Sequence, residues 1–316
     1  MQRSKWVPVR CRRHGFVMLA VLVCLIVAGL ALVTLAQRSM RLSALAIEKQ
    51  RSLQHKWGVL SCQRTLLPRA AQHFKLLGEE AEQARKRSSG LVLPAPRSFA
   101  ANFMLGGRRF ELLLADENAK VNLNYSYHHL GRPGTERLVN RVLSGALHPP
   151  VRLYAHPPTK PVDVYETLMD DKVLPIVLGS WGQVFDLSRA VGPGAHRSLP
   201  NLTSRLTLWG RGELNVRRAV DATILDTCQL VVSEGPARQL QGECRDKDKQ
   251  KQQVDRLVEQ LNVDEDEQFL LQEMLTEHSS CFSLWTTVSS MYVESQQLAI
   301  LQVDEEGVMR TMEFVY

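Results

Sequence analysis

An uninterrupted apolar run from Phe16 to Ala36 constrains this 316-residue chain more than any other feature. The run contains no charged residue. As an α-helix rising about 1.5 Å per residue, it would be roughly 30 Å long, which is the thickness of one hydrocarbon core. The chain contains one such run, so the sequence predicts a single membrane-spanning helix near its N-terminus.

A short basic segment precedes the apolar run. Its residues are Arg10, Arg12, Arg13 and His14, followed by Gly15. An ordinary secretory signal has a shorter core and is cut after it, but a cut near Ala36-Gln37 matches the small-x-small pattern poorly. One alternative is a cut before the core, between Gly15 and Phe16; another is a plain signal anchor that is never cut. The first arrangement resembles the leader of type IV prepilins and pseudopilins.

The net charge of +6 arises largely in front of the apolar run. The basic residues there are Arg3, Lys5, Arg10, Arg12 and Arg13, and the rest of the chain is close to neutral. A basic N-terminal region is expected of an exported chain, so the charge does not indicate nucleic acid binding. Basic residues also follow the run: Arg38, Arg41, Lys49 and Arg51, offset only by Glu48. The positive-inside rule therefore favours a cytoplasmic N-terminus by a small margin, which places the C-terminal body in the periplasm.

Beyond the span, the apolar spacing predicts a helical stalk broken at Pro68, with a second helix over 69–86. A proline-broken linker, 91–99, follows. Arg109–Leu114 is typical of a strand and Lys120–Asn124 of a second one, with the polar turn Asp116–Ala119 between them, so a β-hairpin is expected. The asparagines at its end are suited to capping or to hydrogen bonding with backbone.

The remainder divides into a helical part and a terminal sheet. Short helices are expected at Thr135–Leu147 and Val162–Leu168, at Ser180 with Gln183 as its capping-box partner, from Asp221, and over Glu267–Leu275. Val254, Leu257, Val258 and Leu261 have the spacing of an amphipathic helix. Leu206–Leu214 is expected to contain a strand. The runs Cys281–Val288, Ser290–Val293, Gln297–Val303 and Val308–Val315 predict an antiparallel meander with a turn at Asp304–Gly307.

Two asparagine-containing segments lie on either side of the central part. They are Asp116–Asn124 and Leu206–Ala219, the second including Asn215-Val216-Arg217-Arg218-Ala219. Together with the leader and the long helix, these segments resemble the K-class minor pseudopilins of bacterial type II secretion systems, the general secretion pathway protein K family. The family's usual second segment is Asn-Val-Asn-Thr-Ala, so Arg217 and Arg218 depart from it.

The resemblance implies an α+β fold: a transmembrane helix, then a pilin-like α/β domain with an antiparallel sheet, interrupted by a helical SAM-like insert. The implied boundaries are leader 1–15, transmembrane helix 16–36, helical stalk 37–90, first part of the pilin-like domain 91–124, helical insert 125–205, and remainder of that domain 206–316. Prepilin peptidase would cut between Gly15 and Phe16 and methylate the Phe16 amine. The family is not enzymatic. It works at the tip of the pseudopilus with the I- and J-class minor pseudopilins, in the inner membrane.

Ala20 occupies the fifth position after the expected cut, where most pilins have glutamate. A carboxylate inside a bilayer needs a partner, and in a fibre that partner is the N-terminal amine of a neighbouring subunit. A subunit at the tip has no subunit ahead of it, so an apolar residue suits that place. K-class pseudopilins lack this glutamate. The alternative is that Ala20 marks a chain that is no pilin.

The family also binds calcium, which takes six to eight oxygen ligands. The densest acidic runs here are 264–267 and 304–306, and the weak calcium candidates are Asp264, Asp266, Asp304 and Glu306. The family's Asp-Trp-x-Asp segment is represented only by Asp163 and by Met169-Asp170-Asp171. Such acidic runs are also typical of solvated faces. Cys228, Cys244 and Cys281 form no CxxC motif, and the sequence leaves their pairing open.

Catalytic motifs are missing from the sequence, which has no P-loop, no Gly-x-Ser-x-Gly and no His-Glu-x-x-His. His128-His129 is expected in a polar surface loop, without a carboxylate or cysteine at metal spacing. No basic stripe with interleaved aromatics indicates nucleic acid binding. Three other interpretations stay open: a membrane-anchored periplasmic binding module, a type IV pilus minor pilin, and an anchored enzyme with a dispersed active site.

Overall fold

The computed structural model describes residues 14–87, 94–144, 148–155, 160–170, 172–187, 199–246, 253–289, 294–304 and 306–316. The expected leader, Asp171 and the expected strand Ser290–Val293 therefore lie wholly or almost wholly outside the described residues. The chain forms two compact units, Met1–Trp57 and Gly58–Tyr316. The fold is α+β, with a long apolar helix at the N-terminus and a body of helices and antiparallel strands.

The first unit consists, in its described part, of helix α1 (His14–Leu66) as far as Trp57. An 18-residue window of this helix has a mean hydropathy of 3.2, and no part of the window is buried. By length and composition α1 can therefore cross a membrane, as predicted. The single-turn η1 (Leu67–Arg69) holds Pro68 and separates α1 from α2 (Ala70–Arg87), which confirms the expected break in the stalk.

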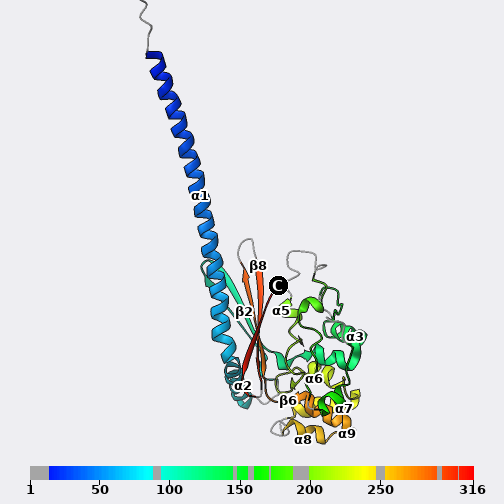
Figure 1. The fold of residues 1–316 in the computed structure, drawn as a ribbon. Coiled ribbons are helices and arrows are strands. Elements are labelled where there is room, and N and C mark those ends of the chain that lie inside the picture. Colours follow the sequence, from blue (N-terminus) through cyan, green and yellow to red (C-terminus); the bar gives the residue numbers. More distant parts are fainter. Residues whose placement is uncertain are drawn as a thin grey trace, which may run out of the picture. The chain divides into compact units, whose positions relative to one another are not determined.

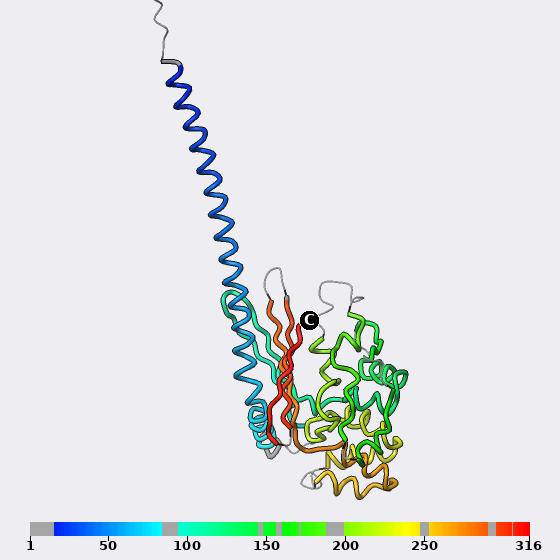
Figure 2. The backbone as a smooth tube through the Cα atoms, in the orientation of Figure 1, coloured from blue at the N-terminus to red at the C-terminus, as the bar shows by residue number. Residues whose placement is uncertain are grey.

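The second unit contains a five-stranded antiparallel sheet. Its strands are β1 (Ser98–Leu105), β2 (Arg108–Asp116), β7 (Cys281–Ser289), β8 (Glu294–Val303) and β9 (Met309–Val315), in the order β1-β2-β7-β8-β9. Figure 2 shows the early strands lying beside the C-terminal ones. The register pairs Phe110 with Val288 and Leu114 with Leu284. Two strands that are about 170 residues apart in the sequence are therefore neighbours in the sheet.

The two faces of the sheet pack against separate hydrophobic cores. Phe110, Leu112 and Leu114 of β2 face the end of α1 and α2, where Phe74 stacks on Phe282 with ring centroids 5.8 Å apart. Gly58 permits this close approach, because a Cβ there would lie 2.7 Å from the Phe110 ring. The opposite face, with Trp285, Leu298 and Ile300, packs against the helical part. Strand β7 is buried on both faces, and its buried residues include Ser283 and Thr286 beside five apolar side chains.

The chain between β2 and β7 forms the helical part (Figure 1). Its helices are η2 (Glu117–Ala119), α3 (Leu123–Val142), α4 (Val164–Met169), η3 (Trp181–Gln183), α5 (Leu199–Leu202), α6 (Asp221–Cys228), α7 (Glu234–Arg245), α8 (Val254–Glu259) and α9 (Glu265–Met274). Its short strands are β3 (Val121–Asn122), β4 (Leu206–Thr207), β5 (Leu214–Asn215) and β6 (Leu275–Thr276). β3 pairs with β4 and β5 pairs with β6, both in parallel.

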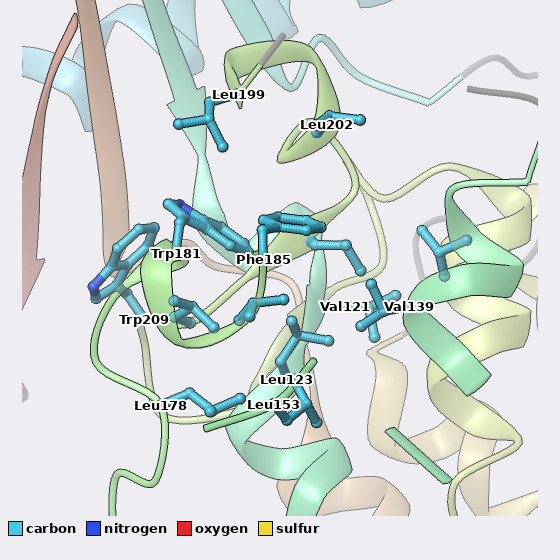
Figure 3. Close-up of a cluster of buried hydrophobic side chains, with 14 of the residues drawn as sticks. Val121, Leu123, Val139, Leu153, Leu178, Trp181, Phe185, Leu199, Leu202 and Trp209 are labelled. Carbon is cyan, nitrogen blue, oxygen red and sulfur yellow. The ribbon is translucent and has the colours of Figure 1, made fainter. Parts of the chain in front are cut away.

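Two apolar cores fill the helical part. The first gathers Trp181, Phe185, Leu123 and Leu178 against the sheet, with Trp181 edge-on to Trp209 (Figure 3). The second joins α6 to α9, and the four apolar residues predicted for an amphipathic helix at 254–261 are all buried in it. The capping box at Ser180 and Gln183 is present, as expected.

One expectation about the strands is wrong. Lys120–Asn124 does not return alongside Arg109–Leu114; the real hairpin is β1–β2, which turns at Gly106 and Gly107, both with positive φ. The 91–99 linker therefore ends inside β1. Leu206–Leu214 contains the expected strand, but it is short: it is the two-residue β4, and the segment ends with the first residue of β5. The cause is tertiary, because β3 pairs with β4 instead, and the buried Asn122 and Asn124 side chains hydrogen-bond to the backbone of distant segments.

Candidate functional site

The expected processing site lies at the beginning of α1. Gly15 and Phe16 are in the first turn of the helix, and the Phe16 side chain is 76% exposed. Ala20 lies one turn further along the same helix and is also exposed. A chain beginning at Phe16 would therefore carry its free amine directly on the first turn of an apolar helix. Cleavage and methylation at this site stay predictions.

A second candidate site lies where the chain passes from the sheet to the helical part. We call it the polar junction; it consists of Asp116, Glu117, Asn118, Lys120, Asn215, Arg217, Arg218, Glu277, Ser279 and Ser283. These residues come from three separate segments: the end of β2 with η2, the region of β5, and the segment leading into β7. Asp116–Asn124 and Leu206–Ala219, which carried the sequence resemblance, thus meet here in space.

Asparagine amides connect these segments through backbone groups. Asn118 Oδ1 accepts from the Ser280 and Cys281 amides at 3.0 and 2.9 Å, and its Nδ2 donates to the Glu213 carbonyl at 3.1 Å. Asn215 Nδ2 donates to Ser279 Oγ at 2.7 Å, while its Oδ1 accepts from the Arg217 amide. Each amide therefore uses both its donor and its acceptor, which fixes its orientation.

Asn122 and Asn124 bracket the beginning of α3. The Asn122 side chain caps that helix by accepting from the Tyr125 amide at 3.0 Å, and it donates to the Trp209 carbonyl. Asn124 makes four bonds: it donates to the Leu178 and Leu208 carbonyls and accepts from the Val177 and Leu178 amides, all at 2.7–2.9 Å. The prediction that these asparagines cap or bond backbone is confirmed.

A buried ion pair lies within η2. Lys120 Nζ is 2.5 Å from Glu117 Oε1, and the two side chains are 4% and 0% exposed. Ser283 Oγ also donates to Glu117 Oε1, while Glu117 Oε2 has no hydrogen-bond partner among the described residues. The polar hairpin turn expected at Asp116–Ala119 is therefore wrong, because these residues form the buried single-turn η2 rather than the turn of a hairpin.

Asp116 is the most strongly perturbed carboxyl of the junction. Burial raises its pKa to about 6, against the opposing effects of the Ser279 hydroxyl, the Arg218 guanidinium and the Asn118 amide. Ser279 Oγ donates to Oδ2 at 2.5 Å, the Asn118 amide donates to Oδ1 at 3.0 Å, and Arg218 Nε lies 3.4 Å from Oδ2. Burial dominates because the carboxylate is removed from water on all sides.

Arg217 and Arg218, which depart from the family pattern, have partners of their own in this chain. Arg217 Nη2 pairs with Glu277, and Arg218 Nη1 donates to the Pro96 carbonyl at 2.9 Å. Arg218 also lies over the Phe74 ring, 5.1 Å from its centroid. Arg218 thus links the junction to the segment in front of β1 and to α2, while the Arg217 ion pair lies within the junction. Such roles for arginine were not visible from the sequence, since each depends on residues distant along the chain.

The histidine pair does not lie in a surface loop. His128 and His129 are within α3, and His128 is buried, with Nε2 2.9 Å from the Pro175 carbonyl and Nδ1 accepting from the Val162 amide. Burial lowers the pKa of His129 to about 4, and neighbouring His128 contributes. The bonds tie α3 to two loops, so the pair supports packing. The sequence expectation failed because the segment in front of Gly131 and Pro133 is itself helical, and the backbone leaves helical geometry only at Gly131.

The calcium candidates are in two places. Asp264 caps α9 by accepting from the Glu267 amide at 2.7 Å, and Asp266 bonds to the Tyr165 hydroxyl, which raises the pKa of that tyrosine. Asp304 and Glu306 line a cavity of about 480 Å³ together with Arg310, whose Nη2 is 3.8 Å from Asp304. Within the described ranges, no group of three or more His, Cys, Asp or Glu is arranged to hold a metal ion. Calcium binding by these residues stays a prediction.

Three cysteines left open by the sequence are buried free thiols. Cys228 and Cys244 belong to the same core between α6 and α7, and Cys281 begins β7. Burial raises the pKa of Cys244 to about 11 and raises those of Cys228 and Cys281 well above their ordinary value. None of the three is thus prepared to act as a thiolate nucleophile.

The described residues define an α+β protein with one N-terminal helix able to cross a membrane and a body whose two parts are joined by buried polar contacts. No family model matches the chain, and no curated protein matches it. One solved structure that is similar is the GspK-GspI-GspJ complex from the type 2 secretion system of enterotoxigenic Escherichia coli. The match has 13% sequence identity and a TM-score of 0.45, covering 86% of this chain and 99% of that one. A TM-score at this level does not establish a shared fold.

Proposed function

We propose that this chain is a K-class minor pseudopilin of a type II secretion system. It is anchored in the inner membrane by α1, its body lies in the periplasm, and it acts by assembly rather than by catalysis. The observation that carries the proposal is the position of Gly15-Phe16, directly in front of an uncharged helix that the mature protein would retain. A removable signal needs its cut on the other side of that helix.

The body supports the same proposal. The sheet strands come from 98–116 and 281–315, and the chain between them forms the helical part. The asparagine-containing segments that the resemblance singled out contribute Asn118 and Asn215, which hydrogen-bond to the beginning of β7 and the residues just before it. In a protein that works by assembly, such fastening keeps the docking surfaces of both parts in a fixed arrangement.

Within this proposal, the chain occupies the tip of the pseudopilus. Ala20 supplies the argument, because a carboxylate at that depth would need the N-terminal amine of a subunit ahead of it. The partners are the I- and J-class minor pseudopilins, with which the chain primes fibre growth, and prepilin peptidase, which processes the leader. The boundaries at 15/16, 36/37, 90/91, 124/125 and 205/206 belong to the proposal as well.

N-terminal sequencing of the membrane-bound form tests the proposal. We expect the mature chain to begin at Phe16 and to be one methyl group heavier at its N-terminus than the unmodified residue. Gly15→Leu should leave the leader attached, since the small residue at the cut is lost, while Gly29→Leu in the same helix should be processed normally. Recovery of the chain with Met1 intact would overturn the pseudopilin function and favour a plain membrane-anchored binding module.

A further inference from the structure

Basic residues of α1 lie along one side of the helix just beyond the membrane span. Arg38, Leu42, Leu45, Lys49, Ser52 and Lys56 follow one another at intervals of four, three, four, three and four residues. These intervals put all six on one side of an α-helix, in the pattern of a coiled-coil seam. We call these six residues the basic seam. All of them are exposed, and Arg41 is exposed at its margin.

The cations of the seam are unneutralised within the described part of the chain. Arg38, Arg41, Lys49 and Lys56 form no ion pair with another described residue. Between residues 14 and 57 the sole acidic side chain is Glu48. Leu42 and Leu45 lie between these cations with 59% and 52% of their surface exposed. In coiled coils, charged side chains set the choice of partner, and because Lys49 and Lys56 occupy the seam itself, a partner helix needs acidic residues directly opposite them.

The length of the seam decides between lipid and protein as its occupant. Arg38 and Arg41 follow Ala36 by two and five residues, about 3 and 8 Å along the helix, which is within the headgroup layer. Lys49 and Lys56 follow it by 13 and 20 residues, about 20 and 30 Å, which is beyond the reach of lipid headgroups. A protein segment running alongside α1 can reach the whole seam, whereas lipid headgroups cannot.

A second copy of this chain does not fit the seam. Two copies in parallel register would oppose Lys49 to Lys49 and Lys56 to Lys56, and like charges directly opposed across a helix interface are unfavourable. We propose that the basic seam binds the stalk helix of a different single-span subunit, whose facing positions carry Asp or Glu. The inference rests on the proposed function, in which several pilin-like helices leave the membrane side by side.

Site-specific photo-crosslinking of the full-length chain in its own host tests this. A photoreactive amino acid replaces Ser52, which is in the seam, or Gln50, which is at the same depth on the other side of the helix. We expect the Ser52 probe to give an adduct that maps to an acidic helix next to the membrane span of another protein, and the Gln50 probe not to give it.

Charge reversal provides the matched comparison. Lys49→Glu should lower the yield of the Ser52 adduct at least about fivefold, while Arg51→Glu, which makes the same charge change off the seam, should leave it within about twofold. Changing the mapped acidic residue of the partner to Lys should restore the adduct in Lys49→Glu. Adducts with lipid only, no adduct at Ser52, or equal effects of Lys49→Glu and Arg51→Glu would overturn the inference.

The outcomes also separate this inference from the proposed function. A seam-dependent adduct with an acidic helix of a protein that is no pseudopilin supports the seam and counts against the pseudopilin function. If the mature chain begins at Phe16 but Lys49→Glu and Arg51→Glu have equal effects, the pseudopilin function is supported and the seam inference is overturned. The N-terminal sequence is therefore determined on the same membrane preparations.

Discussion

Asp116 is a residue whose chemistry changes with its surroundings. Its folded-state pKa of about 6 lies above the ordinary value of 3.8, because burial disfavours the charged form. The native state thus binds a proton in a pH range where the unfolded chain does not. Stability contributed by this group is complete below about pH 4 and is lost as the pH rises through about 6.

This pH dependence gives a prediction for Asp116→Asn. The free energy of unfolding of the wild-type chain should fall by roughly 2–3 kcal/mol relative to the variant between pH 4 and pH 7, since a shift of one pKa unit corresponds to about 1.4 kcal/mol. Denaturant unfolding of the full chain in detergent, followed by fluorescence of Trp181, Trp209 and Trp285, measures it. Parallel pH profiles for the two proteins would show that Asp116 titrates normally.

Gly212 is a second position at which a single residue determines the local structure. Gly212 has a φ of +102°, and a Cβ at this position would come within 2.6 Å of the Tyr125 ring. This glycine lies in the segment between β4 and β5, against the first turn of α3. A larger residue there would have a strained backbone and would displace Tyr125. The close approach of this segment to the Tyr125 ring therefore requires glycine.

At the scale of elements, η2 acts as a buried connector stabilised by paired charges. Lys120→Met should destabilise the fold by about 3–5 kcal/mol, because it leaves the Glu117 carboxylate buried without its partner. The double variant Glu117→Gln with Lys120→Met should recover most of that loss, since neither charge is then buried. Denaturant unfolding of the four proteins forms a double-mutant cycle. Additive effects of the two changes would mean that the residues do not act as a pair.

Elements with strong local signals were predictable from sequence. The long helix, its break at Pro68, the 254–261 helix and the C-terminal meander each follow from apolar periodicity or from a proline. The elements of the junction were not predictable, because Asp116, Glu117 and Lys120 look like an exposed turn until β7 covers them. β1 was missed for a related reason: it is an edge strand with mostly exposed residues, so its alternation is weak.

The candidate sites divide in the same way. The expected processing site consists of consecutive residues, Gly15 and Phe16 at the start of an uncharged run, so the sequence alone predicts its position. The backbone bonding of the junction asparagines was foreseeable as a type of interaction, but its partners were not. Asn124 reaches Leu178 and Leu208, which are 54 and 84 residues away. Only the fold determines such pairs.

At the scale of the whole molecule, tip placement depends on what surrounds α1 in an assembled fibre. Ala20 carries no charge, so α1 needs no partner amine at that depth. If the chain occupies the tip, Ala20→Glu introduces a carboxylate with no subunit ahead of it to neutralise it. The cost of an unpaired charge at the bilayer centre, about 2.5–3.5 kcal/mol on insertion scales, is an upper limit, since position 20 is near one end of the span.

Ala20→Glu should therefore reduce the amount of this chain isolated with the J-class minor pseudopilin from cross-linked membranes by about tenfold or less, as that upper limit allows. Ala20→Leu, which changes size without charge, should leave the amount unchanged. Equal co-isolation of the two variants would mean that another subunit's amine meets the new carboxylate. The chain would then lie within the fibre rather than at its tip, because only an internal subunit has a neighbour ahead of it.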